Sequence, residues 1–367
     1  MGKILLTKQN KPENQQIIEL SKFTSPNKDK ILALMEESLD YPYMLGHILF
    51  NRMGAVAYYT LKTCELLGKV NREFRTTLKS IYDVGVDKSN SFSAAIEMLG
   101  NILRNVGFPY ALLKGAYFNQ RYPVGLRTSN DIDILIEQKN ITSISDLLLA
   151  NGFGQGHIRN GNFTPASRME IIYSRMNQGE TVPFIKRIDL PKMEYLEIDL
   201  NFSLDYKAIQ TNDNVENMLK RAKPLINGNI YTLSEYDFLI HLCVHLYKEG
   251  IIKKVVDMNR DMSIYKFCDI YFLLNDRTNQ QFYKHLTERV NELELDKECY
   301  YAIFYTRELF DMENDGINMF LSAIKPEDTK YLKQVISPSD NKVYEFDEDI
   351  TKWVFCSNRK ERLRELK

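Results

Sequence analysis

The sequence predicts an α+β protein in which a small mixed β-sheet core is flanked by helical N-terminal and C-terminal subdomains. Apolar residues recur with a period close to 3.6 between residues 29 and 106 and again beyond residue 233, which is typical of helices. Short apolar runs and alternating segments lie between them, and these are typical of strands. We therefore expect an N-terminal helical subdomain at 1–106, an α/β core at 107–232 and a C-terminal helical bundle at 233–367.

The helical subdomains are defined by their periodicity. The run 43–67 keeps a helical period throughout, and 91–106 predicts a further helix that Gly107 closes. We expect the N-terminal subdomain to be a scaffold, with the alternative that one of its faces shapes a binding pocket. In the C-terminal bundle we predict helices at 263–274, 279–293 and 297–310, and a short solvent-exposed helix at 359–367.

The core begins with a strand that leads into a helix. The apolar run 110–113 predicts a buried strand that ends at Lys114 and Gly115, and a short helix follows. Backbone N–H groups at a glycine turn before a helix favour anions. This element therefore predicts a place where phosphate groups are bound.

The next strand of the core carries two acidic residues on one side. Side chains alternate between the two faces of a strand, so Asp131 and Asp133 share the open face of the segment 131–137. The residues that face the core are Ile132, Ile134 and Ile136. The two aspartate Cα atoms lie roughly 6.5 to 7 Å apart. Their oxygens suit hard cations, and two cations about 4 Å apart assist phosphoryl or nucleotidyl transfer. The alternative is an exposed strand with two solvated acids.

The order of these residues resembles a family of nucleotidyltransferases in the polymerase-β-like superfamily. The matching features are Leu-Lys-Gly, a short helix with Tyr-Pro, and Arg127 four residues ahead of Asp-Ile-Asp-Ile-Leu-Ile. The resemblance covers roughly residues 85–275. It implies a nucleotidyltransferase core with an NTP as the donor substrate. The chain has Lys114, Gly115 and Ala116 where many members have a Gly-Ser pair, so Lys114 would hold the phosphate as a point charge.

The superfamily also has a third carboxylate on a later strand. Segments 181–189 and 193–202 predict a hairpin, and the second segment alternates. Related sequences tend to have Asp-Leu-His there, whereas this chain has Asp199, Leu200 and Asn201. The resemblance therefore implies Asp199 as the third carboxylate. Glu197, two residues earlier on the same face, is the competing candidate.

The resemblance assigns roles to these residues. The implied catalytic residues, which also bind the metal, are Asp131, Asp133 and Asp199. The residues expected to bind the nucleotide are Lys114, Gly115, Arg127 and Ser129. We expect two Mg²⁺ ions, with Mn²⁺ as the alternative metal. Residues 154–180 have no sustained period and are predicted to form a long loop, for which a lid over the nucleotide is one hypothesis.

Composition restricts the partners of the protein. The formal net charge of the 367-residue chain is −1, which argues against a long nucleic acid as the substrate. No apolar run approaches the length of a membrane span, so we expect no membrane association. The five cysteines are scattered and lack a Cys-x-x-Cys pair, which is typical of the reducing cytoplasm.

These observations together favour one function and leave two alternatives. The favoured function is metal-dependent transfer of a nucleoside monophosphate to a hydroxyl or phosphate of a small molecule, peptide or protein, with release of pyrophosphate. The first alternative is transfer of another phosphate-linked group, such as a sugar phosphate, in peptide or natural-product modification. The second is a non-catalytic partner-binding protein on a degenerate nucleotidyltransferase fold.

Overall fold

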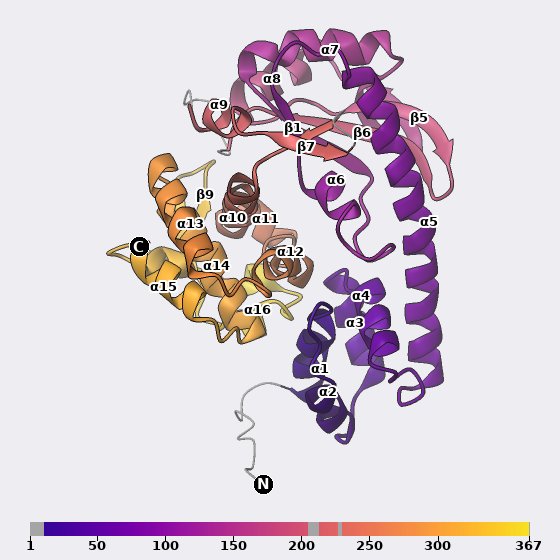
Figure 1. Ribbon diagram of the computed structural model, residues 1–367, viewed down its shortest axis with the longest axis vertical. Coiled ribbons are helices and arrows are strands. Elements are labelled where there is room, and N and C mark those ends of the chain that lie inside the picture. The colour runs from indigo at the N-terminus through magenta and orange to yellow at the C-terminus, as the bar shows by residue number, and fades with distance from the viewer. Residues whose placement is uncertain (1–10, 205–212, 227–229, 367) are drawn as a thin grey trace. The chain divides into compact units, whose positions relative to one another are not determined.

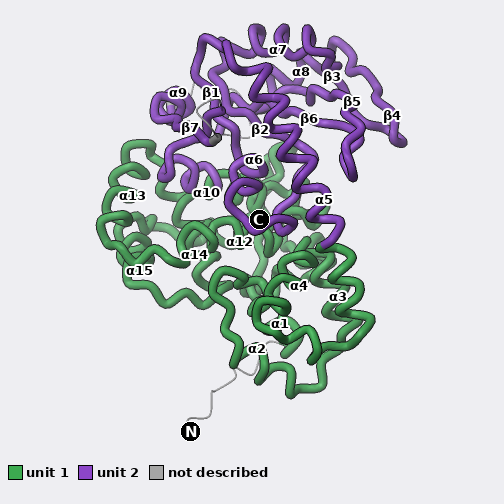
Figure 2. The backbone as a smooth tube through the Cα atoms, turned by 45° about the vertical axis from the view of Figure 1, so that its right-hand side comes forward, with its two compact units in different colours: residues 1–82, 243–367 green, residues 83–242 purple. Residues whose placement is uncertain are grey.

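The computed structural model describes residues 11–204, 213–226 and 230–366 (Figure 1). The chain forms two compact units: a terminal unit made of residues 1–82 and 243–367, and a central unit made of residues 83–242 (Figure 2). The N-terminal and C-terminal helical segments thus share one unit, where the sequence analysis had separated them. Helices combine with a mixed sheet, which confirms the predicted α+β class.

The terminal unit is mainly helical. Its helices are α1 (Pro12–Ser21), α2 (Lys28–Met35), α3 (Tyr41–Phe50), α4 (Gly54–Thr63), α11 (Lys253–Asp257), α12 (Ile264–Leu274), α13 (Gln280–Leu293), α14 (Asp296–Phe310), α15 (Asp315–Ala323) and α16 (Ile350–Trp353). Its strands β9 (Gln334–Ser337), β10 (Lys342–Glu345) and β11 (Arg364–Glu365) form a three-stranded sheet in the order β11-β10-β9. The predicted helices at 263–274, 279–293 and 297–310 are therefore confirmed as α12, α13 and α14.

Two of the predicted N-terminal helices have different bounds in the structure. The run 43–67 is broken between α3 and α4, where Arg52 has a φ of 58°. A residue in the left-handed conformation cannot continue an α-helix. The apolar residues therefore keep a helical period through a position where the helix ends. The predicted helix 91–106 is the last part of α5 (Arg72–Leu103), which runs through the boundary between the two units and ends before Gly107.

The central unit is built on an eight-stranded mixed sheet in the order β4-β3-β5-β6-β2-β1-β8-β7. Its strands are β1 (Tyr110–Leu112), β2 (Asp131–Ile136), β3 (Gly154–Arg159), β4 (Asn162–Pro165), β5 (Phe184–Leu190), β6 (Met193–Asn201), β7 (Lys223–Ile226) and β8 (Ile230–Thr232). Its helices are α6 (Lys114–Asn119), α7 (Ile141–Ala150), α8 (Arg168–Asn177) and α9 (Asp213–Leu219), and α10 (Glu235–Ile251) continues into the terminal unit. The two central strands β2 and β6 are parallel, and β5 and β6 form the predicted hairpin.

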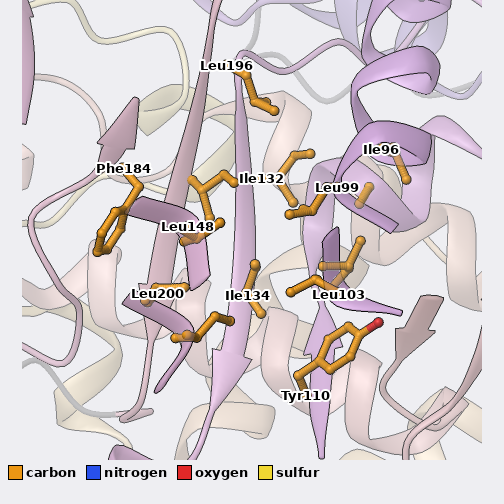
Figure 3. Close-up of a cluster of buried hydrophobic side chains, with 14 of the residues drawn as sticks. Ile96, Leu99, Leu103, Tyr110, Ile132, Ile134, Leu148, Phe184, Leu196 and Leu200 are labelled. Carbon is orange, nitrogen blue, oxygen red and sulfur yellow. The ribbon is translucent and has the colours of Figure 1, made fainter. Parts of the chain in front are cut away.

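One face of this sheet forms the hydrophobic core of the central unit. Ile132, Ile134 and Ile136 of β2 are fully buried there, as the alternation of the sequence predicted. The side chains that cover them come from α5 (Phe92, Ile96, Leu99, Leu103) and α7 (Ile141, Ile144, Leu148). Figure 3 shows this arrangement, with Ile132 and Ile134 beside the α5 side chains. The polar residues of β2 and β6 consequently lie on the other face.

The segment 154–180 is structured, so its prediction as a long loop is wrong. It contains the hairpin of β3 and β4, followed by α8, whose first turn has a capping box between Ser167 and Glu170. Two positions of β3 are glycines against which the Phe163 ring packs. A Cβ atom on Gly154 would lie only 2.6 Å from this ring. Glycines contribute no hydrophobicity, and for this reason the alternation of β3 was not visible in the sequence.

The C-terminal tail also differs from its prediction. Residues 359–362 form a single 3₁₀ turn and β11 follows it, so the tail is not a solvent-exposed helix. Arg359 is completely buried and forms an ion pair with Asp261. Asp261 is distant from Arg359 in sequence, so a local sequence pattern could not predict the burial of Arg359. Among the described helices, none has the length and apolarity required to cross a membrane.

Candidate active site

The candidate site is a group of carboxylates on the polar face of β2 and β6. In the register of these parallel strands Asp131 lies beside Glu197, and Asp133 lies beside Asp199. Adjacent strands are about 4.8 Å apart, and residues in register point to the same face. The structure therefore brings the three aspartates predicted from the sequence together, with Glu197 in the same group.

Lys114 approaches this group from the end of β1. It is the first residue of α6 and has a φ of 26°, a conformation that is rare for a residue with a side chain. Its Nζ atom lies 3.5 Å from Oδ1 of Asp133, and the backbone N–H of Leu113 donates to the Asp133 carbonyl at 3.0 Å. Such backbone conformations persist where the surrounding structure holds them, and they are frequent at functional sites. The structure thus places the predicted phosphate-binding lysine beside the carboxylates.

Gly115 and Ser129 pack tightly against each other next to Asp131. A Cβ atom on Gly115 would lie 2.9 Å from Cβ of Ser129 and 3.2 Å from its Oγ, so only glycine fits without a shift. The Ser129 hydroxyl donates a hydrogen bond to Oδ1 of Asp131. Arg127 is half-buried in the same turn, and its Nη1 donates to the Thr128 carbonyl at 3.3 Å. The glycine therefore sets the distance between the start of α6 and the turn that holds Asp131.

The carboxyl of Asp199 has a strongly raised pKa. Burial, followed by the neighbouring charges of Asp133 and Asp131, raises the pKa of this carboxyl from 3.8 to about 9. Glu180 and Glu197 add smaller effects in the same direction. The pKa of Glu197 is raised too, chiefly by burial and then by Asp131. No ion pair or hydrogen bond neutralises the Asp199 carboxylate within the ranges that the structure describes.

Sequence reasoning missed Glu180, because it lies at the end of the segment predicted to be a loop. It forms an antiparallel bridge with Asn201, which places the two side chains on the same face of the sheet. Its carbonyl accepts a hydrogen bond of 2.7 Å from the Ser174 hydroxyl. The side chain is exposed at the rim of the carboxylate group. The position of Glu180 at the site becomes apparent from its bridge to Asn201 of β6, the strand that carries Asp199.

The donor set of this group fits a divalent cation. Carboxylate oxygens are the ligands that Mg²⁺ prefers, and among the described residues no cationic side chain forms an ion pair with Asp199. In the part of the chain that the structure describes, however, no three His, Cys, Asp or Glu side chains are already gathered closely enough to hold a metal ion. Binding would thus require some of these carboxylates to change rotamer on strands that stay fixed.

Comparison with known proteins identifies the family of the chain. Residues 45–311 match a family model described as an uncharacterised nucleotidyltransferase. The match covers more than half of the chain and includes every residue of the carboxylate group. It confirms the family resemblance that the residues around Asp131 had indicated. No curated protein and no solved structure matches the chain.

Proposed function

The chain belongs to this nucleotidyltransferase family, and from this premise we propose that it is a metal-dependent enzyme that transfers a nucleoside monophosphate from an NTP. The acceptor is a hydroxyl or phosphate group of a small molecule, a peptide or a protein. The observation that carries the proposal is the register of β2 and β6, which places Asp131, Asp133 and Asp199 on one face. Family membership supports nucleotidyl transfer in general, and the carboxylate group supports its dependence on a metal.

Asp131 and Asp133 on β2, together with Asp199 on β6, hold two Mg²⁺ ions in this proposal, with Mn²⁺ as the alternative. Such cations neutralise phosphate charge and stabilise the attacking and leaving oxygens of an in-line displacement. Burial, followed by the neighbouring charges of Asp133 and Asp131, raises the pKa of Asp199, so this carboxyl binds a proton where no cation is present. The paired strands keep the Cα atoms of these residues in position, so the reorganisation on binding is confined to side-chain rotation.

The start of α6 and the turn before β2 contact the phosphates of the donor. The Lys114 ammonium group, next to Asp133, is within reach of an NTP that contacts the same carboxylates. The Gly115 backbone and the side chains of Arg127 and Ser129 provide further donors. An acceptor oxygen then forms a bond to the α-phosphorus while the bond to the β-phosphate bridging oxygen breaks, and pyrophosphate leaves. Asp199 either takes the acceptor proton or remains a cation ligand.

A thermal-shift panel tests this proposal. The protein is heated with ATP, GTP, CTP or UTP, each with and without Mg²⁺. A ligand at about 100 times its Kd stabilises the folded state by about 2.7 kcal/mol, which raises Tm by several degrees for a chain of this size. We expect such a shift with at least one NTP, only with Mg²⁺, and its loss in Asp133→Ala.

The matched control is Asp146→Ala, which removes an exposed carboxylate from α7 in the same unit. This variant should keep the wild-type shift. The donor that produces the shift is then used to search for acceptors, with pyrophosphate release and product mass as readouts. A folded Asp133→Ala protein that retains full transfer activity contradicts the proposed role of the carboxylates. The absence of a shift with every NTP contradicts the choice of an NTP as donor.

A further inference from the structure

Asn201, at the end of β6, lies at the carboxylate group, and the functions discussed above give it no role. Its side chain is almost fully buried, with 9% of its surface exposed, on the same face as Asp199. The Nδ2 atom donates to Oδ1 of Asp133 at 3.2 Å and to the Asp199 carbonyl at 3.3 Å. A single side-chain amide thus links the Asp133 carboxylate on β2 to the backbone of the neighbouring strand β6.

The hydrogen bond from Asn201 and the contact with Lys114 restrict the rotation of the Asp133 carboxylate. Terminal carboxylate torsions are broad, so an aspartate on a strand is otherwise free to rotate about its last bond. Oδ1 of Asp133 is contacted from two sides, by the Asn201 amide and by the Lys114 ammonium group at 3.5 Å. The amide belongs to β6 and the ammonium group to the start of α6. Both elements are fixed by backbone hydrogen bonds: β6 by its ladder with β2, and the start of α6 through the contact of Leu113 with Asp133.

From this geometry we infer that Asn201 is a positioning residue that fixes the orientation of the Asp133 carboxylate for cation binding. The inference rests on the proposed function. The amide is suited to this place because it donates hydrogen bonds without adding charge to a region where carboxylates already repel one another. Groups that hydrogen-bond to metal ligands orient them, and their removal typically reduces metal affinity by about 10–100-fold.

The test measures Mg²⁺ affinity in the absence of turnover. Tm is recorded as a function of Mg²⁺ concentration at a fixed concentration of the donor nucleotide, without an acceptor. We expect Asn201→Ala to raise the Mg²⁺ concentration at half-maximal shift by about 10–100-fold relative to the wild type. Asn201→His should restore most of the affinity, because an imidazole N–H can also donate to Asp133.

Two further variants separate positioning from a general structural effect. Asn201→Leu has a similar volume and no donor, so it should fold even where the alanine variant leaves a cavity, and it should show the same loss of Mg²⁺ affinity. Asn151→Ala is the matched control, since the side-chain amide of this partly buried asparagine of the same unit donates to the Leu147 carbonyl at 2.8 Å and, among the described residues, not to a carboxylate. Its Mg²⁺ midpoint should equal that of the wild type.

The outcomes distinguish this inference from the function on which it rests. A wild-type Mg²⁺ midpoint in folded Asn201→Ala or Asn201→Leu overturns the positioning role while the proposed function stands. A wild type that shows no Mg²⁺-dependent shift contradicts the proposed function, and the positioning role with it. A higher midpoint in both Asn201 variants, with rescue by histidine and an unchanged Asn151→Ala control, supports the inference.

Discussion

Two aspartates, the fully buried Asp261 and the half-buried Asp199, lie one in each unit and have opposite surroundings. Asp261 in the terminal unit is fully buried, and its carboxylate is bound by the Arg359 guanidinium and by Nε1 of Trp353, the latter at 2.7 Å. Asp199 in the central unit is surrounded by other carboxylates, which together with burial raise its pKa to about 9. The Asp261 charge is compensated by Arg359, whereas the residues that the structure describes supply no countercharge to Asp199.

This difference separates a structural carboxylate from one to which we assign a binding role. A buried charge needs a countercharge or must bind a proton, because low dielectric surroundings penalise the ionised form. Arg359 supplies the countercharge to Asp261 and also donates to the Met262 and Trp353 carbonyls at 3.2 Å, so this ion pair attaches the C-terminal tail to the unit. At Asp199 the proton is the only compensation within the described chain, and in the proposed function a cation replaces it.

The largest effect is expected when the compensated pair is broken. Arg359→Ala leaves Asp261 buried without its countercharge, which should lower the free energy of unfolding by about 3–5 kcal/mol. Urea unfolding followed by the fluorescence of Trp353, the single tryptophan of the chain, measures the loss. Arg187→Ala is the control, because the Arg187 side chain is 62% exposed and its removal should change stability by less than about 0.5 kcal/mol. Equal stability of the two variants would show that Asp261 is not held as described.

A smaller, pH-dependent effect is expected at the uncompensated carboxylate. The pKa of Asp199 is raised from 3.8 in the unfolded chain to about 9 in the folded one, so the folded state binds the proton more tightly. Its contribution to stability is complete below pH 3.8 and is lost as the pH rises toward 9, by at most about 1.4 kcal/mol per pH unit. Without divalent cations, the wild type should therefore lose stability relative to Asp199→Asn between neutral pH and pH 9. Parallel stability profiles would contradict the raised pKa.

The smallest effect concerns the packing beside Asp131. Gly115→Ala places a Cβ atom 2.9 Å from Ser129, which must move together with its hydrogen bond to Asp131. We expect a loss of stability of about 1 kcal/mol and weaker nucleotide-dependent stabilisation. Gly46→Ala in α3 has no atom within 4 Å of the added Cβ and should be neutral or stabilising. The Tm of both variants is measured with and without NTP and Mg²⁺. Equal Tm values and equal nucleotide-dependent shifts would show that the close approach of Gly115 to Ser129 is unimportant.

The sequence revealed the features that depend on local pattern. Alternation assigned the three isoleucines of β2 to the core and placed Asp131 and Asp133 on the opposite face, because strand period alone determines this. The hairpin of β5 and β6 followed from two neighbouring runs. The partner of Asp133 was different: Asp199 is distant in sequence, and only the family resemblance indicated it before the register of the parallel strands was known.

Features that depend on distant contacts were not visible in the sequence. The burial of Arg359 depends on Asp261, 98 residues away, so the tail appeared to be solvated. Glu180 joins the site only through its bridge to Asn201, and it follows a hairpin whose alternation is hidden by glycines. The role of Asn201 depends likewise on its hydrogen bond across the sheet to Asp133. In each case a pairing between separate segments determines the role of the residue.

The most direct test of the cation site is the proton balance of Mg²⁺ binding. Calorimetric titrations at neutral pH, in buffers with different heats of ionisation, measure the protons released when the nucleotide-free protein binds Mg²⁺ or Mn²⁺. A pKa of about 9 implies that Asp199 binds a proton at neutral pH, and metal ligands must be deprotonated. The wild type should therefore release about one proton per protein, and Asp199→Asn should release none. Binding without proton release in the wild type, or equal release from both proteins, would contradict the assignment of Asp199 to the cation site.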